Sequence, residues 1–502
     1  MQTILTVLGV LLVITDYVIK FLAIGVLPTN KKPSSAMAWL ILILVIPFAG
    51  FVVFLFLGRT NIGAKRQARQ KEADEAIRAA TERVVSTSST TESGSTTENG
   101  STSGGGPPPY LASMAILNRN LGSLPLQPGN HIELFPGYAD AIAAMTRAAT
   151  EAQHSIEVEF YISAWDEVTS PFFEALVAAA ARGVTVRLLF DHMGSRGIPG
   201  YKDFVAKLQT SGIAWHPMLA VQPLKGKFQR PDLRNHRKIM VADGRVAFTG
   251  SQNLIEPGYN KPKNHAAGRE WVELVARVDG PAVNALRAVF AKDWYTEAHE
   301  RLGDEIRTDT VTVHPDGPET VTAQVLPSGP GYVTENNLRL FTALIYSAQA
   351  RVSLTSPYFV PDEPLLYAVT TAARRGVDVE LFVSEEGDQF MVYHAQCSYY
   401  EALLEAGVRI HLYPAPAVLH SKHFSIDDDV AVIGSSNMDM RSFALNYEVS
   451  LMLTGGDIVR RFRDVEDSYR AVSRELTLEE WRGRPWGKRY VDNAMRLTAA
   501  LQ

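Results

Sequence analysis

Residues 236–253 read HRKIMVADGRVAFTGSQN, and residues 420–437 read HSKHFSIDDDVAVIGSSN. Both segments follow one pattern, His-x-Lys-x4-Asp-x6-Gly-Ser-x-Asn, which places six residue types at fixed spacing. In a chain of average composition this pattern arises by chance at roughly one start position in 20 to the sixth power. Two copies in one chain therefore indicate a duplicated unit whose histidines and lysines carry a function.

Each copy predicts a β-hairpin that starts near its histidine. Side chains alternate across a strand, so a histidine and a lysine two positions apart point to the same face. In the first copy two apolar runs flank Asp243 and Gly244, and this pair is a turn signal. The second copy turns more loosely, between Ile426 and Asp429. Asp243 and Asp427 fall at the bends, where we interpret them as structural members of the motif and not as proton carriers.

Brought together in one cleft, the two copies would suit transfer of a phosphodiester. Two ammonium groups, with serine and asparagine donors, can neutralise charge on the phosphate oxygens. One neutral imidazole can attack phosphorus, while the other passes the proton of the exchanged hydroxyl, and imidazole has the right pKa for both roles. The candidate catalytic residues are the motif residues His236, Lys238, Asp243, His420, Lys422 and Asp427, and the candidate phosphate-binding residues are Ser251, Asn253, Ser435 and Asn437.

The duplicated motif resembles the HKD motif of the phospholipase D superfamily. Within it, the chain looks most like the bacterial cardiolipin synthases, through its apolar N-terminal segments and through SIEVEFYIS, GVTVRLLFDHMGS, SPYFVPD and NMDMRSFALNYE. The resemblance covers nearly everything from about residue 5 to the C-terminus. It implies a membrane-bound phosphatidyltransferase that joins two phosphatidylglycerol molecules into cardiolipin and releases glycerol.

The reading as a cardiolipin synthase also assigns roles to single residues. His236 is expected to be the nucleophile, forming a phosphohistidine, and His420 the general acid and base, although the near symmetry of the motifs leaves the reverse open. An acidic residue after each Gly-Ser-x-Asn segment is expected to hold a histidine ring. Glu448 fits this place in the second half, and Glu273 in the first, with Glu270 as a competitor. The lysines take the electrostatic role of a cation, so no metal and no cofactor is expected.

Composition narrows the class of protein further. A formal net charge of -5 over 502 residues is poorly suited to general nucleic-acid binding, which disfavours a nuclease. Cys397 is the only cysteine, so disulfides within the chain and thiolate metal clusters are excluded. The further near-site candidates are His192, Asp191 and Tyr358 outside the motifs and His423 inside the second motif, and packing or surface roles are favoured for the two histidines.

The first 60 residues predict a two-helix transmembrane hairpin. Residues 3–27 and 38–57 are apolar and long enough to cross a bilayer, with an interfacial position of the first as an alternative. Asp16 and Lys20 interrupt the first run four positions apart, where they can pair. Basic residues follow the second run, which places everything after residue 58 in the cytoplasm. We therefore expect a multi-pass protein of the bacterial plasma membrane that binds phosphatidylglycerol and other anionic lipids and no nucleic acid, with oligomerisation left open.

Four regions follow from these patterns: the hairpin over residues 1–60, a charged helix and Ser/Thr/Gly-rich flexible linker over 61–110, and phospholipase D-like domains over 111–310 and 311–502. The low-complexity part of the linker covers residues 86–109, and the second domain ends in a basic C-terminal segment. The two domains contain similar segments, AAAARGVTVRLLF in the first and TAARRGVDVELFV in the second. Each half runs strand, helix, strand, helix, strand before its hairpin, which predicts an α/β fold of two similar α/β/α sandwich halves. The superfamily resemblance implies a pseudo-two-fold axis that places both histidines at one cleft.

Other functions stay open at this level. A phospholipase D or headgroup-exchanging enzyme would use water or another alcohol as acceptor, and phosphatidylethanolamine is an alternative acceptor lipid. A membrane-tethered binding protein would have a degenerate site, but both copies retain histidine and lysine.

Overall fold

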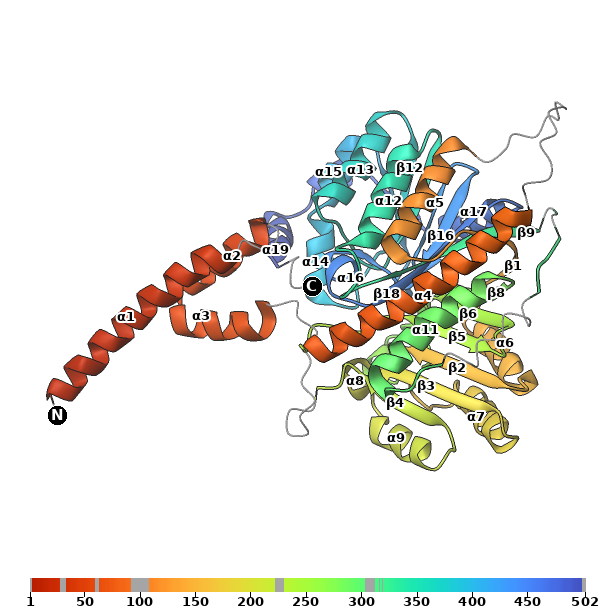
Figure 1. Cartoon of the computed structure of the whole chain (residues 1–502). Helices are drawn as coiled ribbons and strands as arrows, with labels where there is room; N and C mark the ends of the chain where they lie inside the picture. The colour runs from red at the N-terminus through yellow and green to blue at the C-terminus, as the bar shows by residue number, and fades with distance from the viewer. Residues whose placement is uncertain are drawn as a thin grey trace. The chain divides into compact units, whose positions relative to one another are not determined.

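The computed structural model of the chain describes residues 2–27, 33–58, 63–91, 108–221, 230–302, 312–315, 317 and 319–498. They fall into two compact units, which we describe separately. One unit comprises Met1–Ala64 with Arg230–Asp232, and the other comprises Lys65–Gln229 with Leu233–Gln502. The second unit contains both motifs and is the larger of the two (Figure 1).

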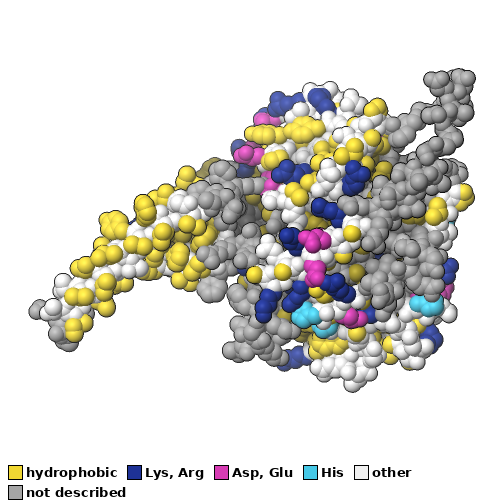
Figure 2. Space-filling view, in the orientation of Figure 1, with side chains coloured by type: hydrophobic (Ala, Val, Ile, Leu, Met, Phe, Trp, Pro, Cys, Tyr) yellow, Lys and Arg dark blue, Asp and Glu magenta, His cyan; other side chains and the backbone are white. Residues whose placement is uncertain are grey.

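Helix α1 (Gln2–Val26) is the one helix in the described residues that is long and apolar enough to cross a membrane, over Thr6–Val26. Its apolar side chains are largely exposed, and hydrophobic side chains cover much of its surface in Figure 2. Asp16 and Lys20 form the expected ion pair, with 2.9 Å between Oδ2 and Nζ.

The second apolar segment is not one long helix, so the structure does not show the predicted hairpin of two spanning helices. It is divided into α2 (Pro33–Val45), α3 (Pro47–Val53) and a π-helix, η2 (Phe54–Gly58). Pro47 explains the break, because proline has no N–H to donate and its ring clashes with the preceding turn. Lys31 and Lys32, which separate the two segments in the sequence, lie outside the described residues. A small apolar cluster joins α1, α2 and η2 through Ala23, Ile43 and Phe54, together with Leu27 just after α1.

The second unit is built on a 15-stranded mixed sheet in the described residues. Its first half holds β1 (Gln127–Phe135), β2 (Ser155–Phe160), β3 (Thr185–Asp191), β4 (Ala214–Met218), β5 (Lys238–Ala242), β6 (Val246–Gly250) and β8 (Val275–Asp279). Its second half holds β9 (Thr320–Ser328), β10 (Arg351–Thr355), β12 (Asp378–Ser384), β13 (Arg409–Tyr413), β15 (His423–Ile426), β16 (Val430–Gly434), β18 (Glu448–Thr454) and β19 (Arg474–Leu476).

The strand order has the expected two-fold symmetry. β1 and β9 pair antiparallel at the centre of the sheet. Outward from them lie β8 and β18, then β6 and β16, β5 and β15, β2 and β10, β3 and β12, and β4 and β13. The two predicted halves are thus joined edge to edge in one sheet, and the two hairpins, β5–β6 and β15–β16, occupy equivalent places.

Helices cover both faces of this sheet, so the unit has three layers, helix, sheet and helix. Alternate residues of β5 show the division, because Ile239 and Val241 face one core while Met240 and Ala242 face another. Helices α11 (Ala282–Ala298) and α17 (Ile458–Val472) share the first core. The opposite face carries α6 (Tyr138–Glu151), α7 (Ser170–Ala181) and α9 (Tyr201–Gln209) in the first half, and α12 (Asn336–Ser347), α13 (Glu363–Arg374) and α15 (Tyr400–Ala406) in the second.

Two helices depart from the expected boundaries. The charged helix α4 (Ala64–Thr91) runs beside α11 (Figure 1) and extends six residues into the stretch predicted as a flexible linker. Its Asp74 pairs with Lys292 of α11, 2.5 Å from Oδ1 to Nζ. Helix α5 (Pro109–Gly122), expected in the first half, packs on α12 and β9 of the second. The remaining linker, residues 92–107, lies outside the described residues.

Candidate active site

Each histidine of the duplicated motif is bound to the backbone of the other half. His236 N donates to the carbonyl of Tyr447 at 2.9 Å, immediately before β18. His420 N donates to the carbonyl of Val272 at 2.8 Å, where β14 (Val418–Leu419) pairs with β7 (Trp271–Val272). The two pairings are equivalent under the two-fold symmetry. They bring the first motif beside the second.

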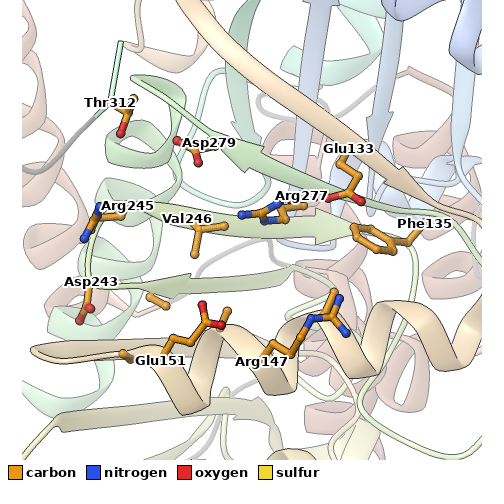
Figure 3. A pocket seen from close by; sticks show the side chains of 14 residues that line it. Glu133, Phe135, Arg147, Glu151, Asp243, Arg245, Val246, Arg277, Asp279 and Thr312 are labelled. Carbon is orange, nitrogen blue, oxygen red and sulfur yellow. Dashed lines mark hydrogen bonds and ion pairs between the residues drawn. The ribbon is translucent and has the colours of Figure 1, made fainter. Parts of the chain in front are cut away.

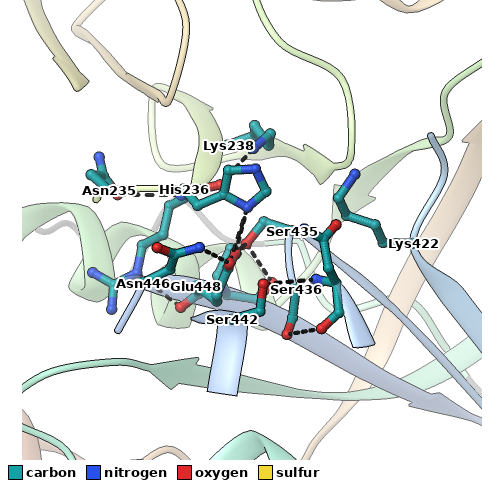
Figure 4. A network of polar contacts seen from close by, with 12 residues as sticks. Asn235, His236, Lys238, Lys422, Ser435, Ser436, Ser442, Asn446 and Glu448 are labelled. Atoms are coloured by element: carbon teal, nitrogen blue, oxygen red, sulfur yellow. Dashed lines mark hydrogen bonds and ion pairs between the residues drawn. The ribbon is translucent and has the colours of Figure 1, made fainter. Parts of the chain in front are cut away.

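A buried glutamate holds each imidazole, and the structure supplies the pairing that the sequence left unassigned. Nδ1 of His236 lies 3.0 Å from both carboxylate oxygens of Glu448, and Nδ1 of His420 lies 2.7 Å from Oε1 of Glu273. Each glutamate therefore holds the histidine of the opposite half, because each histidine segment pairs with that half. Glu270 contributes only its carbonyl, to Val418 N. Figure 4 shows Glu448 beneath the His236 ring, with Lys422 of the second motif nearby.

The two lysines are buried and turn back on their own motifs. Lys238 Nζ donates to the carbonyl of His236, and Lys422 Nζ to that of His420, both at 2.6 Å. Burial and the nearby Lys422 lower the pKa of Lys238 to about 7, and burial lowers the pKa of Lys422 to about 8. The prediction that each histidine shares a strand with its lysine is wrong, because both histidines precede the strands β5 and β15.

Electrostatics distinguish the two histidines although their geometry is similar. Burial, Lys238 and Lys422 together hold the pKa of His236 well below its usual value. Burial also lowers the pKa of His420, but the Glu273 carboxylate opposes that shift. Burial raises the pKa of Glu448 to about 7, whereas His420 and Lys422 outweigh burial and lower the pKa of Glu273. The Glu273 carboxylate thus favours a proton on His420, whereas both lysines disfavour one on His236.

Both predicted serines and Asn253 are engaged with protein groups. Ser435 Oγ donates to Glu448 Oε2, and Ser251 Oγ accepts from Leu274 N at 3.0 Å. Asn253 donates from Nδ2 to the Tyr259 hydroxyl at 2.8 Å, while Asn437 is buried in the second copy. In this arrangement the serines support the strands and glutamates that hold the histidines.

Comparison with known proteins gives a consistent assignment. The family model described as "Cardiolipin synthase, PLD-like domain" matches residues 145–294 and 341–468, and a "Phospholipase D-nuclease N-terminal" model matches residues 4–59. Cardiolipin synthase A of Pectobacterium carotovorum subsp. carotovorum (strain PC1) is 32% identical over 501 residues, covering 98% of this chain and 98% of that one. The chain belongs to the cardiolipin synthase family.

Other relatives agree with this membership. Cardiolipin synthase A of Yersinia pseudotuberculosis serotype O:1b (strain IP 31758) is 33% identical over 463 residues, covering 92% of this chain and 91% of that one. The crystal structure of phosphatidylserine synthase from Haemophilus influenzae Rd KW20 matches with a TM-score of 0.55 at 14% identity, over 78% of this chain and 100% of that one. The latter shows the fold alone, and with the family match it confirms the predicted duplicated phospholipase D-like fold.

The motif aspartates of this cardiolipin synthase family member lie away from the histidines. Asp243 and Asp427 follow β5 and β15, so Asp243 is about 16 Å along the strand from Lys238. Asp243 accepts backbone N–H groups of residues 153, 154 and 155 at 2.7–3.0 Å, and Asp427 accepts those of residues 349, 350 and 351 at 2.7–2.8 Å. Both have a positive φ, 52° and 47°. These contacts favour a structural role.

We predict that Asp243→Ala lowers the free energy of unfolding by about 2 kcal/mol, because three charge-assisted hydrogen bonds are lost and alanine tolerates a positive φ poorly. The folded fraction should keep its kcat. Chemical denaturation and activity per folded molecule measure the two effects, with Asp243→Asn as the milder variant that still tolerates the turn. A lower kcat at unchanged stability would instead place this carboxylate in the chemistry.

Sequence reasoning missed Arg237, which stands between the first histidine and lysine. Its Nε donates to the carbonyl of Glu448 at 3.0 Å, its Nη1 pairs with Asp293, and its guanidinium lies 5.3 Å from the Tyr447 ring centroid. The second copy has Ser421 at this place, so the two-fold symmetry is broken here. A charged residue inside a buried motif was the available signal, but only the structure identifies its partners.

Helix α4 contacts the same tyrosine, which the sequence did not suggest. Gln70 donates from Nε2 to the Tyr447 hydroxyl at 2.9 Å, and Arg66 lies 5.8 Å from the ring centroid. Arg66 is itself paired with Glu297 at the end of α11, at 2.7 Å. Tyr447 precedes Glu448 and accepts the amide of His236, so α4 buttresses the backbone that positions the first histidine.

The other near-site candidates have structural partners. Asp191 caps helix α8 (His192–Arg196) and pairs with Arg234 at 2.9 Å, while His192 accepts the amide of Val221. His423 packs between rings of α17, and burial lowers its pKa to about 3. Tyr358 does lie at the site, because its ring centroid is 6.3 Å from that of His420.

A cavity of about 400 Å³ lies apart from the histidines, at the bend that contains Asp243 (Figure 3). Both arginines and acidic residues line it, and Arg277 pairs with Glu133 at 3.2 Å. The cavity is at the far end of β5 from His236, so we assign it no part in the chemistry.

Proposed function

We propose that the protein is a phosphatidyltransferase that converts two phosphatidylglycerol molecules into cardiolipin and glycerol through a phosphohistidine. The observation that carries this proposal is the pair of imidazoles, each held at Nδ1 by a glutamate of the opposite half. This hydrogen bond assigns Nε2 of each ring to the reaction, since it fixes the other nitrogen. Two buried lysines beside the rings supply positive charge for the phosphate.

In the first step, Nε2 of His236 attacks the phosphorus of one phosphatidylglycerol. A P–N bond forms, the P–O bond to glycerol breaks, and His420 donates a proton to the departing alkoxide. In the second step, His420 takes the proton from a terminal hydroxyl of a second phosphatidylglycerol, whose oxygen displaces His236 from phosphorus. One phosphodiester replaces another, so the exchange needs no nucleotide.

The electrostatic difference between the rings supports this order. The lowered pKa of His236 keeps its ring neutral, with an unprotonated Nε2 for attack. His420 is paired with Glu273, whose own pKa is lowered, and an ionised carboxylate stabilises the imidazolium that a general acid requires. The opposite order would place the nucleophile beside the stronger counter-charge.

The membrane arrangement is part of the same proposal. Helix α1 anchors the enzyme, and the segment α2 to η2 completes a second pass despite its break at Pro47. The basic residues Lys65, Arg66 and Arg69 then place the catalytic unit in the cytoplasm of a bacterial cell, at the plasma membrane. Reporter fusions after Gly58 and after Gln502 should both report the cytoplasmic side, and a periplasmic signal from either would contradict this topology.

Product analysis tests the reaction. The purified protein in phosphatidylglycerol vesicles should yield cardiolipin and glycerol in equal amounts. Phosphatidic acid as the main product would show that water is the acceptor, and the protein would then be a phospholipase D. Product that appears only after phosphatidylethanolamine is added would identify that lipid as the acceptor.

We predict an alkaline decline in kcat/KM. The pKa values of about 7 for Lys238 and about 8 for Lys422 mean that both ammonium groups lose their charge as pH rises, so stabilisation of the phosphate is lost between about pH 7 and 9. Lys422→Arg should extend activity to higher pH, because a guanidinium stays charged. Initial rates in mixed vesicles measure the profile. A flat profile over this range would show that the lysine charges do not limit the reaction.

A further inference from the structure

Helix α19 (Trp486–Arg496) carries a partly apolar stripe on its exposed face. Trp486, Tyr490, Asn493 and Leu497 follow the spacing i, i+4, i+7 and i+11, which places them on one side of the helix. Trp486 is 78% exposed and Tyr490 is 62% exposed, and their rings stack with centroids 5.5 Å apart. Two large aromatic side chains stacked in water indicate a surface that meets a partner.

The opposite face of α19 is anchored, so the helix cannot roll to bury this stripe. Asp492 is buried, 2.7 Å from Nδ1 of His394 and 2.8 Å from Nη1 of Arg484. Met495 packs against the core of the second half, and Arg496 lies over the ring of Tyr399 at 4.4 Å. These contacts therefore keep the aromatic face of α19 exposed to solvent.

Helix α14 (Phe390–Cys397) extends this apolar surface toward the active site. Phe390, at its first position, is 66% exposed and packs on His394 at 4.3 Å between ring centroids. The preceding residue, Gln389, donates to the hydroxyl of Tyr358 at 2.9 Å, and that ring is the one beside His420. A short series of contacts thus joins the exposed aromatic surface to the catalytic histidine.

The charge of α19 indicates the chemistry of the partner. Lys488 and Arg489 are exposed next to the aromatic stripe, with Nη2 of Arg489 3.8 Å from Glu401 of α15, and the only acidic residue of the helix, Asp492, is buried in its ion pairs. Tryptophan and tyrosine favour the boundary between headgroups and acyl chains, and flanking cations are attracted to anionic lipids. The chain also holds a candidate membrane span, so a bilayer is its expected setting.

We propose that this surface, called here the docking face, seats the catalytic unit on the headgroup layer of an anionic bilayer. It consists of Phe390, Met391, Trp486, Lys488, Arg489, Tyr490 and Leu497. The inference rests on the proposed function, since both substrates are lipids of that bilayer. Seated in this way, the site takes donor and acceptor from the plane of the membrane, and neither lipid has to leave it. The docking face then governs access of phosphatidylglycerol, not the chemistry at phosphorus.

The double variant Trp486→Ser/Tyr490→Ser tests this in the full chain reconstituted in nanodiscs. KM, measured as the mole fraction of phosphatidylglycerol, should rise roughly tenfold while kcat is unchanged. The matched control is Tyr346→Ser. Tyr346 is 43% exposed near the end of α12, beside the start of β10, whereas Tyr358 and the site follow the other end of that strand. An unchanged KM in the double variant, or an equal rise in the control, would overturn the proposal.

Fluorescence quenching provides a measurement that does not depend on activity. Cys397 is buried, so a fluorescent label attaches to an introduced Tyr490→Cys or Tyr346→Cys. Brominated phosphatidylglycerol in the nanodisc should quench the label at position 490 and spare the label at position 346. Equal quenching at the two positions would show that the docking face is not seated on lipid, whatever reaction the enzyme catalyses. Wild-type protein that makes no cardiolipin, yet shows selective quenching at 490, would refute the proposed function and leave the docking face intact.

Discussion

Replacing His236 by alanine should lower kcat for cardiolipin formation on the order of 10⁴-fold or more, because no other group can form the covalent intermediate. His420→Ala should be similarly inactive with phosphatidylglycerol, so steady-state rates do not separate the two roles. A phosphatidyl donor that releases p-nitrophenolate does separate them, since this leaving group needs no proton. With it, His420→Ala should accumulate phosphatidyl-enzyme, and His236→Ala should remain unlabelled.

Mass spectrometry of the quenched enzyme measures the label and locates it. His423→Leu is the matched control, because this buried histidine lies inside the second motif, yet its ring packs on Phe462 and Tyr469 of α17. It should label and turn over normally. Label on His236→Ala, with none on His420→Ala, would reverse the assignment of nucleophile and acid.

Glu448→Gln should slow enzyme labelling by about 100-fold or more, although Glu448 lies in the half opposite to the nucleophile. The loss follows from its contact with Nδ1 of His236, which sets the tautomer and orientation of that ring. Glu273→Gln should leave labelling by the activated donor nearly unchanged and slow the second step, which uses His420. Rapid-quench kinetics with the p-nitrophenyl donor resolve the two steps.

The crossed pairing makes this result specific. If each glutamate served the histidine of its own half, Glu273→Gln would slow labelling and Glu448→Gln would slow only the second step. If the two histidines exchanged roles, Glu448→Gln would slow the second step and not labelling, but it should still resemble His236→Ala in the step that it affects. Ser435, which donates to Glu448, offers a milder version of the same test through Ser435→Ala.

The sequence was most informative where chemistry and spacing coincide. The motif identified both histidine–lysine pairs, the hairpins and the duplication, and the sheet confirms the equivalence of the halves. Both glutamates were also found, because an imidazole that acts at one nitrogen needs an acceptor at the other. The histidine that each glutamate holds was not assigned from the sequence, because it depends on how the two halves meet, and local spacing carries no information about that contact.

Other features could be recognised only from the structure, for a different reason. Gln70 and Tyr447 are 377 positions apart, and neither has an unusual local pattern. The break in the second apolar segment did have a sequence signal, Pro47, but high hydropathy over residues 38–57 outweighed it. From the sequence, the region of α19 was recognised only as a basic C-terminal segment. Its aromatic stripe became apparent once the structure showed which face of the helix is anchored.

Helix α4 affects where the enzyme can be shortened. The low-complexity stretch near residue 100 looks like the natural place to cut the membrane anchor from a soluble enzyme, by protease or by truncating the gene. Such a cut would also remove α4, and with it the side chains that lie on Tyr447 and Lys292. A soluble fragment that begins before Lys65 retains this helix. One that begins at residue 108 would lack the contacts of Gln70 with Tyr447 and of Asp74 with Lys292, and its low activity would wrongly be attributed to the missing membrane.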